Sequence, residues 1–581
     1  MFPLHDPLTD TLRKELSAHD DLTAALLARR GVVTKDEAGK FLNPSYDEHL
    51  HDPFLMTDMQ KAAERFARAI TSGEKIAVWS DYDCDGIPGA VVLHDFLKKA
   101  GANFENYIPH RHEEGYGMNV SGIEKLAKNG VKLIVTVDSG ITDVEPVTRA
   151  NELGMEVIVT DHHLPQEKLP DAFAILNPNA RPDETYPYKS LCGSSVAWKL
   201  VCAVLATEPK LREGVPQGWE KWLLDMVGLA TIADMVSLTG ENRVLATYGL
   251  KVLRKSPRIG LQKLLRGMRV EQRAITEDDV GFMIAPRVNA ASRIGEARDA
   301  FQLFITTDEN EADLLAKKLE KLNRERKAQA GAITRAVHTR LSARGGSASG
   351  GKDALPPVIA MGDPDWRPAL LGLVANTIAD EYERPVFLWG REGNMSLKGS
   401  FRSGGFAQVM ELLRATENTF AQFGGHAKAG GFTVLDTEVF FLEDRLVEAH
   451  AKIETVENDS LANHADAIIT PAEATYEFLK KVERLAPFGM ENPKPVFLLR
   501  DVFLQGISRF GKAKEHLKLK IDVDEGGATI DAVTFFVKGS IARAVENLST
   551  GSRVNILAHL ERDTFSRGNP IRLRLLDIRP V

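Results

Sequence analysis

The chain has 581 residues, 43% of them hydrophobic and 27% charged, and its formal net charge of −8 at pH 7 argues, taken alone, against nucleic-acid binding. The composition excludes a chain that is disordered throughout, and the length accommodates about three to four domains. Three cysteines without a CxxC pair exclude a disulfide framework and a zinc knuckle, and they favour a reducing cytoplasm.

Residues 1–72 are predicted to be a helical lead-in that packs on the next domain. The stretches LTAALLARR and MQKAAERFARAI have apolar residues at helical spacing and few β-branched residues. The start, MFPLHDPLTDTLRKEL, contains no apolar h-region, and no later stretch approaches the ~20 apolar residues of a membrane span. We therefore expect a protein that is neither exported nor embedded in a membrane.

Residues 73–305 are predicted to form an α/β domain around a parallel sheet. KIAVWS is followed by PGAVVLHDFLKKAG, VKLIVTVD is followed by VEPVTRANELG, and MEVIVTD comes next. Strands that alternate with helices indicate βαβ units, and ligands of such sheets bind at the carboxyl ends of the strands. Acidic motifs stand at three of these ends: DYDCDG, VDSG and DHH. We expect the three motifs to converge in space.

DYDCDG carries Asp81, Asp83 and Asp85 at positions i, i+2 and i+4. In an extended strand end these carboxylates would point the same way, toward a single cation. An EF-hand loop would need a further Glu about six residues after the Gly, where this chain has PGAVVLH. The segment therefore predicts a catalytic metal site. Asp138 in VDSG is also typical of a helix N-cap when taken alone.

Asp161, His162 and His163 directly follow a buried strand, so both imidazoles cannot face the core. A mixed Asp/His set favours Mn²⁺, whereas sites of mostly carboxylates also admit Mg²⁺. Asp234 lies in the apolar helical stretch GLATIADMVSL, where an unpaired carboxylate is costly; we favour a metal over a basic partner.

Two divalent cations that share a bridging carboxylate and lie roughly 3.5–4 Å apart would clamp an in-line displacement at phosphorus and acidify a bridging water. The expected ligands of this pair are Asp83, Asp85, Asp138, His162 and Asp234. The predicted chemistry is phosphoester hydrolysis.

Three further regions follow along the chain. Residues 306–344 are predicted to be one long charged helix that connects domains and ends in the Gly/Ser-rich ARGGSASGGK. Residues 345–460 form a second α/β unit, and residues 461–581 are strand-rich, which suggests a β-barrel with the OB-fold as a candidate. Basic residues flank an aromatic one at Arg509, Phe510, Lys512 and Lys518, a pattern that suits single-stranded nucleic acid, although a solvated strand face is the alternative.

The order DxDxDG, VDSG, DHH and ADMV resembles the DHH phosphoesterase superfamily. Motifs along nearly the whole chain further resemble the RecJ family of bacterial single-stranded-DNA exonucleases. They are RHEEGYG (111–117), LCGSSVA (191–197), ENR (241–243), APRVNAASR (285–293), KLNRERK (321–327), GSFRSGG (399–405), FGGHAKAGG (423–431) and LAPFGMENPKPVF (485–497). Together these motifs are specific, whereas most of them are not when taken singly.

The resemblance implies a DHH domain, a DHH-associated domain and an OB domain, and 5′→3′ degradation of single-stranded DNA to mononucleotides in repair and recombination. It implies catalytic roles for Asp83, Asp85, Asp138, His162, His163 and Asp234, and metal ligation by these six together with Asp81 and Asp161. It implies DNA contacts at Arg111, Arg287, Asn289, Arg293, Ser400, Arg402, Ser403, Gly424, Gly425 and His426. A monomer is expected, with a single-stranded-DNA-binding protein and a RecQ-like helicase as partners.

At two places the chain departs from the family pattern: IPGA follows DYDCDG, and Trp79 stands where some members have histidine. Two other interpretations stay open. An oligoribonuclease or a cyclic-dinucleotide phosphodiesterase of the superfamily would share only the two α/β domains. A non-catalytic DNA-binding scaffold would usually have lost metal motifs that stand intact in this chain.

Overall fold

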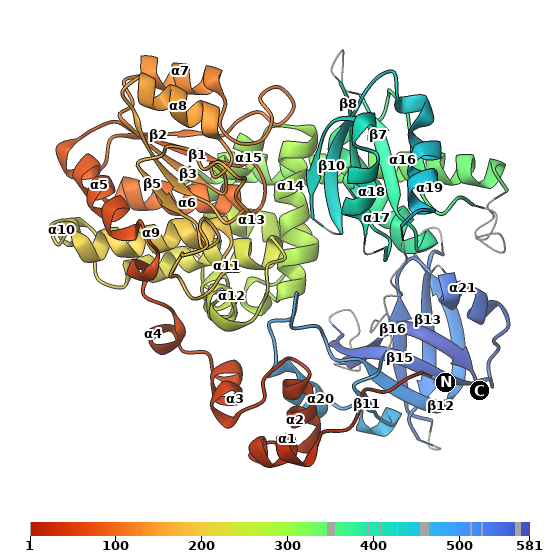
Figure 1. Cartoon of the computed structure of the whole chain (residues 1–581). Coiled ribbons are helices and arrows are strands. Elements are labelled where there is room, and N and C mark those ends of the chain that lie inside the picture. Colours follow the sequence, from red (N-terminus) through yellow and green to blue (C-terminus); the bar gives the residue numbers. More distant parts are fainter. Residues whose placement is uncertain are drawn as a thin grey trace. The chain divides into compact units, whose positions relative to one another are not determined.

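The computed structural model (Figure 1) describes residues 2–345, 355–391, 396–406, 408–426, 428–453, 464–511, 514–524, 527–537, 539–563 and 571–581. The chain divides into two compact units. The first unit comprises Leu8–Asn323 and Val482–Lys494, and the second comprises Met1–Pro7, Arg324–Lys481 and Pro495–Val581. The long helix α16 (Glu309–Ala343) contributes residues to both, so the predicted long helix is confirmed.

The first unit begins with short helices, as predicted. They are α1 (Asp10–Glu15), α2 (Asp21–Ala28), α3 (Lys35–Leu42), α4 (Tyr46–His49) and α5 (Met59–Ser72). Side-chain oxygens of Thr9, Asp20 and Thr34 cap the first three, each accepting a hydrogen bond from a backbone N–H of the first turn.

The predicted parallel sheet is confirmed. Its strands are β1 (Ile76–Ser80), β2 (Phe104–Tyr107), β3 (Leu133–Val137), β4 (Glu156–Thr160) and β5 (Ala174–Leu176), and they lie in the order β2-β1-β3-β4-β5. All four pairings are parallel. Because β1, β3 and β4 are parallel neighbours, their carboxyl ends lie next to one another at one edge of the sheet. The strand order reverses beside β1, which is where such sheets bind ligands.

Helices cover both faces of this sheet because its strands are buried on both sides. On one face, α5, α6 (Gly86–Lys99) and α9 (Gly193–Thr207) share an apolar core with α11 (Leu224–Ala233), α12 (Gly240–Leu253), α13 (Ile259–Met268) and α15 (Ala297–Ile305). On the other face lie α7 (Val120–Lys128) and α8 (Val144–Glu152), as Figure 1 shows. Trp79 belongs to this second face, where it stacks on Tyr107 at 4.1 Å between ring centroids.

The second unit holds a mixed sheet and a barrel. The sheet has the order β6 (Ile359–Gly362), β7 (Val386–Gly390), β8 (Leu397–Arg402), β10 (Ala429–Val434) and β9 (Phe420–Gly425), with helices α17 (Pro368–Tyr382), α18 (Val409–Ala415) and α19 (Leu442–His450). After α20 (Tyr476–Glu483) come β12 (Phe497–Phe510), β13 (His516–Asp522), β14 (Thr529–Thr534), α21 (Gly539–Glu546), β15 (Arg553–Arg562) and β16 (Ile571–Pro580). Because β12 pairs with both β13 and β15, these five strands close into the predicted barrel.

Within the described ranges, no helix combines the length and the apolar character needed to cross a membrane.

Candidate metal centre and nucleic-acid contacts

The three predicted acidic motifs converge at the carboxyl edge of the parallel sheet. Asp81 follows β1, Asp138 follows β3, and Asp161 with His162 and His163 follows β4. Asp234, the C-cap residue of α11, approaches from a helix. Their ligand atoms make three groups that each lie within 4.8 Å: Asp81, Asp83 and Asp138; Asp138, His162 and His163; and Asp85, His162 and Asp234.

The local geometry of DYDCDG differs from the prediction. The strand ends at Ser80, and Tyr82–Asp85 form a turn that leads into α6, because Asp83 Oδ1 accepts hydrogen bonds from the N–H groups of Asp85 (2.8 Å) and Gly86 (3.2 Å). The three carboxylates therefore do not point along one extended strand to a single cation. Asp81 and Asp83 join one ligand group and Asp85 joins another.

Asp85 is held by the amino terminus of α9. Its Oδ2 accepts a hydrogen bond from Gly193 N at 2.6 Å, its Oδ1 accepts one from Ser194 N at 2.8 Å, and Ser194 Oγ donates to the Asp85 carbonyl at 2.6 Å. A Cβ at Gly193 would lie 2.6 Å from Asp138 Cβ. Glycine at this position therefore lets the helix terminus approach two carboxylates at once.

Asp138 occupies the centre of the cluster in a strained backbone conformation. Its φ is 58°, its N–H donates to the Thr160 carbonyl at 3.0 Å, and its carbonyl accepts the Tyr116 hydroxyl at 3.0 Å. His162 Nε2 lies 3.2 Å from Asp138 Oδ1, 3.7 Å from Asp234 Oδ2 and 3.8 Å from Asp85 Oδ2. One imidazole thus faces three carboxylates that come from different elements.

Asp161 orients the two histidines through hydrogen bonds. Its Oδ1 accepts hydrogen bonds from His162 N (2.7 Å), His163 N (3.1 Å) and His163 Nδ1 (2.8 Å), and its Oδ2 accepts one from Ile141 N (3.0 Å). Burial opposes ionisation, yet the His163 hydrogen bond and charge hold the pKa of Asp161 below its ordinary value. Asp161 belongs to none of the three ligand groups found among the described residues.

The same interaction changes His163. Burial by itself would lower the pKa of this imidazole, but the hydrogen bond and the charge of Asp161 raise it above the ordinary value. The Tyr116 hydroxyl also lies 3.1 Å from His163 Nδ1. For His162, burial outweighs the neighbouring carboxylates, and its pKa is lowered. The neutral form of His162 is the form that ligates a metal.

The electrostatics of the cluster fit a divalent cation. Burial and neighbouring carboxylates raise the pKa of Asp81, Asp138 and Asp234 well above their ordinary value. Asp81 Oδ1 and Asp138 Oδ1 are buried and accept no hydrogen bond from the described part of the chain. Buried, mutually repelling oxygens beside a neutral imidazole are the donors that Mn²⁺ and Mg²⁺ accept, and a bound cation would remove the repulsion.

The predicted DNA contacts in APRVNAASR take different positions on α14 (Ala285–Ile294). Asn289 Oδ1 accepts a hydrogen bond from Cys84 N at 2.9 Å and so supports the DYDCDG turn. Arg111 lies 4.8 Å from the centre of the Tyr82 ring, and the charge of Arg293 also acts on Tyr82. Arg287 is 7% exposed and pairs with Glu320 at 2.7 Å, so the structure does not present its guanidinium to a ligand.

In the second unit, the residues predicted from GSFRSGG and FGGHAKAGG come together across three strands. Ser400 is paired with Gly431 of β10, which is paired with Gly424 of β9. Gly425 has φ 142° at the turn where His426 N donates to the Ala429 carbonyl. Ser403 follows β8, and its N–H donates to the Lys428 carbonyl.

Arg402 lies beside this glycine-rich turn. Its guanidinium donates to its neighbour's carbonyl at 2.7 Å and lies 2.9 Å from where a Cβ of Gly372 on α17 would be. Burial lowers the pKa of Arg402, and the charge of the Asp380 carboxylate offsets only part of this shift. A half-buried guanidinium on the strand that pairs with the glycine-rich β10 is suited to an anion.

On the barrel, Phe510 joins an aromatic cluster that the sequence analysis only half identified. It contacts His516 and Phe535, with ring centroids 5.0 and 5.8 Å away, and Arg574 lies 4.4 Å over Phe535. Phe536, 66% exposed, packs edge-on against His516. Arg509 is exposed and Lys518 pairs with Asp531 at 3.3 Å, whereas Lys512 is outside the described residues.

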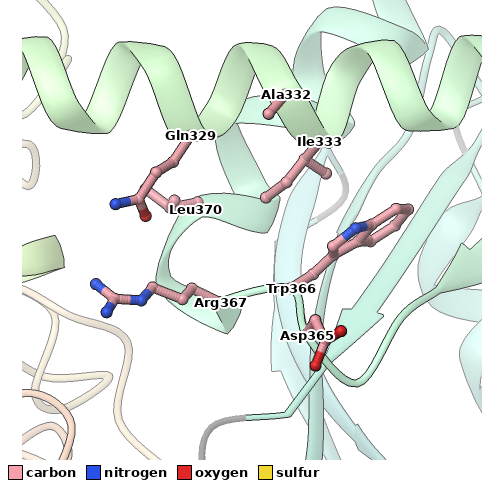
Figure 2. Close-up of a pocket in the computed structure, with 7 residues that line it drawn as sticks. All are labelled: Gln329, Ala332, Ile333, Asp365, Trp366, Arg367 and Leu370. Atoms are coloured by element: carbon pink, nitrogen blue, oxygen red, sulfur yellow. The ribbon is translucent and has the colours of Figure 1, made fainter.

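Tyr116, Gly193 and Ser194 contact the acidic cluster, and no role for them was predicted from the sequence. They lie in RHEEGYG and LCGSSVA, which were noted as motifs without roles for these residues. A separate pocket of about 370 Å³ lies between α16 and the start of α17 (Figure 2). Gln329 and Ile333 line it from α16, with Trp366, Arg367 and Leu370 opposite, and no predicted site residue is among the described residues that line it.

Three family models match the chain. The DHH family, N-terminal domain, matches residues 75–231, the DHHA1 domain matches residues 355–457, and the RecJ OB domain matches residues 465–577. Among curated proteins, the single-stranded-DNA-specific exonuclease RecJ of Bacillus subtilis is 35% identical over 96% of this chain and 67% of the relative. The protein of that name from Escherichia coli is 32% identical over 83% of this chain and 84% of the relative.

Solved structures agree with these relatives. RecJ from Thermus thermophilus in complex with Mn²⁺ matches with a TM-score of 0.80 and 26% identity, over all of this chain and 79% of that chain. An exonuclease RecJ bound to manganese matches with a TM-score of 0.59 and 32% identity, over 70% of this chain and 98% of that chain.

Proposed function

This chain belongs to the RecJ family of DHH phosphoesterases, and we propose that it is a divalent-cation-dependent exonuclease that degrades single-stranded DNA from the 5′ end to mononucleotides. The observation that carries the proposal is the convergence of three ligand groups, of which two contain Asp138 and two contain His162. Two neighbouring cations require ligands that they can share. The substrate class, single-stranded DNA, is taken from the relatives.

We propose that the centre holds two divalent cations and prefers Mn²⁺, with Mg²⁺ as an alternative, because the donor set mixes imidazole with carboxylates. When bound, the cations would supply an acidified water and charge stabilisation at the phosphorus. Asp81 and Asp83 would hold one cation, Asp85, His162 and Asp234 the other, and Asp138 would contribute to both.

The remaining residues of the centre would position these groups. Asp161 would orient His163 and raise the pKa of this imidazole, so that His163 is suited to donate a hydrogen bond to an oxygen of the scissile phosphate. The amino terminus of α9 would hold Asp85, and Asn289 would hold the turn that carries Asp83.

For the nucleic acid, we propose three contact regions. Arg111 and Arg293 would contact the backbone near the centre, Ser400, Arg402 and Ser403 with the turn Gly424–His426 would bind a terminal phosphate, and the barrel's aromatic cluster would stack bases. Arg509 and Lys518 would neutralise phosphates there. Burial and the pair with Glu320 make Arg287 a structural residue in this proposal.

We also propose the broader properties that were expected from the sequence. They are the domain boundaries 73–305, 306–344, 345–460 and 461–581, a monomeric cytoplasmic protein, a role in DNA repair and recombination, and partnership with a single-stranded-DNA-binding protein and a RecQ-like helicase.

The test uses purified protein with Mn²⁺ and single-stranded DNA labelled at the 5′ end or, separately, at the 3′ end, beside blunt duplex and short RNA. Labelled mononucleotide released first from the 5′ label, with duplex resistant, supports the proposal. Asp138→Asn is the control variant, because asparagine tolerates the positive φ of this position. It should lower the rate by roughly 1000-fold, since several kcal/mol of charge stabilisation depend on the ligands.

Two other outcomes would replace the proposal. Hydrolysis restricted to di- to tetranucleotides would identify an oligoribonuclease-like enzyme, and hydrolysis of cyclic dinucleotides alone a phosphodiesterase of that class. Binding of single-stranded DNA without cleavage under Mn²⁺ or Mg²⁺ would identify a scaffold.

A further inference from the structure

The segment Val482–Lys494 belongs to the first unit, although the match to the RecJ OB domain includes it. Arg243 of α12 is 2% exposed and attaches the segment to the core. Its guanidinium donates to the carbonyls of Leu485 at 2.8 Å and Ala486 at 2.9 Å, and also to that of Phe41 at 2.6 Å. One buried arginine thus joins α12, the N-terminal helices and this segment.

Residues 485–492 form a loop whose shape is set by its own polar contacts. Asn492 is fully buried, and its Nδ2 donates to the carbonyls of Leu485 (2.8 Å) and Pro487 (2.7 Å). Its Oδ1 accepts a hydrogen bond from Arg30 Nε. Gly489 and Asn492 exchange backbone hydrogen bonds of 2.9 and 3.2 Å. Burying a satisfied amide in this way specifies one conformation of the loop.

This loop contacts the residues that follow the metal-ligand position Asp234. Leu238 N donates to the Met490 carbonyl at 2.9 Å, and Ser237 Oγ donates to Glu491 Oε2 at 2.6 Å. Gly489 lies so close to Leu238 that a Cβ there would be 2.6 Å from Leu238 Cδ1. Leu238 itself is 2% exposed.

The backbone after Asp234 needs external support. Helix α11 ends at Ala233, and Met235 has φ 59° and is 69% exposed. A non-glycine residue in this left-handed region is strained and persists where neighbouring structure holds it. A hydrogen bond from the Tyr188 hydroxyl to the Thr239 carbonyl (2.9 Å) supports this backbone on one side, and the loop 489–491 supports it on the other.

We infer that Gly489, Met490 and Glu491 form a clamp, the 489–491 clamp, that sets the position of the Asp234 carboxylate and thereby the affinity of the centre for divalent cations. The inference rests on the proposed function in one respect, since it takes Asp234 as a cation ligand. The clamp residues are positioning residues, because they act through Ser237 and Leu238.

The first measurement is amide hydrogen exchange in the metal-free, full-length protein. Gly489→Ala forces Leu238 away, and Glu491→Ala removes the acceptor of Ser237. Both should accelerate exchange across residues 235–239, with little change in β1 and β3. Glu477→Ala, which removes an exposed pair with Lys480 in the second unit, is the matched control.

The second measurement is Mn²⁺ binding without DNA, by titration calorimetry. Loss of groups that orient metal ligands typically weakens binding by 10–100-fold, so we expect about 10-fold weaker binding for Gly489→Ala and a smaller effect for Glu491→Ala. Ser237→Ala combined with Glu491→Ala should be no worse than the weaker-binding single variant, because Ser237→Ala already removes the contact that Glu491→Ala removes. Saturating Mn²⁺ should return the cleavage rate close to that of the unaltered protein.

Unchanged exchange at residues 235–239 together with unchanged Mn²⁺ affinity in folded Gly489→Ala and Glu491→Ala would overturn the inference. Equal acceleration of exchange in β1 and β3 would do so too, since it would indicate general destabilisation. If the unaltered protein binds Mn²⁺ but does not cleave single-stranded DNA, the proposed function fails while the exchange and affinity results still decide the role of the clamp.

Discussion

Asp161 and His163 illustrate how neighbouring residues of one motif take different tasks. The oxygens of Asp161 accept hydrogen bonds from His162, His163 and Ile141, so this carboxylate orients an imidazole. Such outer partners fix the tautomer and direction of a catalytic or ligating histidine.

Replacing Asp161 by asparagine should therefore lower kcat/KM for single-stranded DNA by about 10–100-fold, a smaller loss than that of Asp138→Asn. The reason is that Asp161 belongs to none of the ligand groups, whereas its replacement removes the charge that orients His163 and raises the pKa of that imidazole. Steady-state kinetics with Asp171→Asn, a change on an exposed loop before β5, as control would check this. A loss as large as that of Asp138→Asn would instead make Asp161 a ligand.

The raised pKa values of Asp81, Asp138 and Asp234 predict a specific pH dependence of the metal-free protein. Below their ordinary value of 3.8 these acids are protonated in both the folded and unfolded states. As pH rises, the unfolded chain releases these protons first, so the stabilising contribution is lost as pH passes through the raised folded-state values.

Thermal unfolding with a chelator, measured at several pH values from about 4 to about 8, should therefore show the free energy of unfolding falling as pH rises, and falling more steeply in the native protein than in Asp138→Asn. Mn²⁺ should restore stability most at the upper end of this range, where the carboxylates are ionised. Indifference of the native protein to Mn²⁺ at about pH 8 would contradict the assignment.

At the scale of elements, the amino terminus of α9 is what joins Asp85 to Asp138. Gly193→Ala should reduce activity by about 10–100-fold, because its Cβ would lie 2.6 Å from Asp138 Cβ and the helix must retreat from both carboxylates. The matched control is Gly267→Ala in α13, where nothing lies within 4 Å of the added Cβ. The control should keep activity and gain roughly 0.5–1 kcal/mol of stability. Equal activity of the two variants would exclude the role of α9.

The turn between β9 and β10, with Arg402 of β8, is the second element-scale device. Arg402→Gln should reduce affinity for 5′-phosphorylated single strands by about 10-fold and leave affinity for 5′-hydroxyl strands nearly unchanged, because a charge-assisted hydrogen bond is lost only with the phosphate. Competition binding with both oligonucleotides checks this. Equal loss for the two ends would assign Arg402 to general backbone binding.

At the scale of the whole molecule, the predicted cation ligands all lie in one of the two compact units. Mn²⁺ at about 100 times its dissociation constant stabilises the state that binds it by about 2.7 kcal/mol. Calorimetry should therefore show two unfolding transitions, of which Mn²⁺ raises only one, and Asp138→Asn should abolish that shift. A single transition that shifts as a whole would show that the units unfold together.

The fold was largely predictable because its signals are local. Strand–helix alternation between residues 75 and 161 predicted the parallel sheet, and the spacing of apolar residues from 309 onward predicted α16. The turn at Tyr82–Asp85 was wrongly predicted as extended, because side-chain acceptance by Asp83 overrode the alternation of the preceding strand.

By itself, the sequence determined which donors meet, since parallel strands bring their carboxyl ends to one edge whatever the loops do. It did not determine which of those donors stay free for a cation. Asp161 is occupied by backbone N–H groups, Arg287 by Glu320, and Asn289 by Cys84 across 205 positions of sequence. Only the tertiary structure decided these roles and brought Met490 to Leu238, because such contacts depend on the packing of distant segments and have no periodicity along the chain.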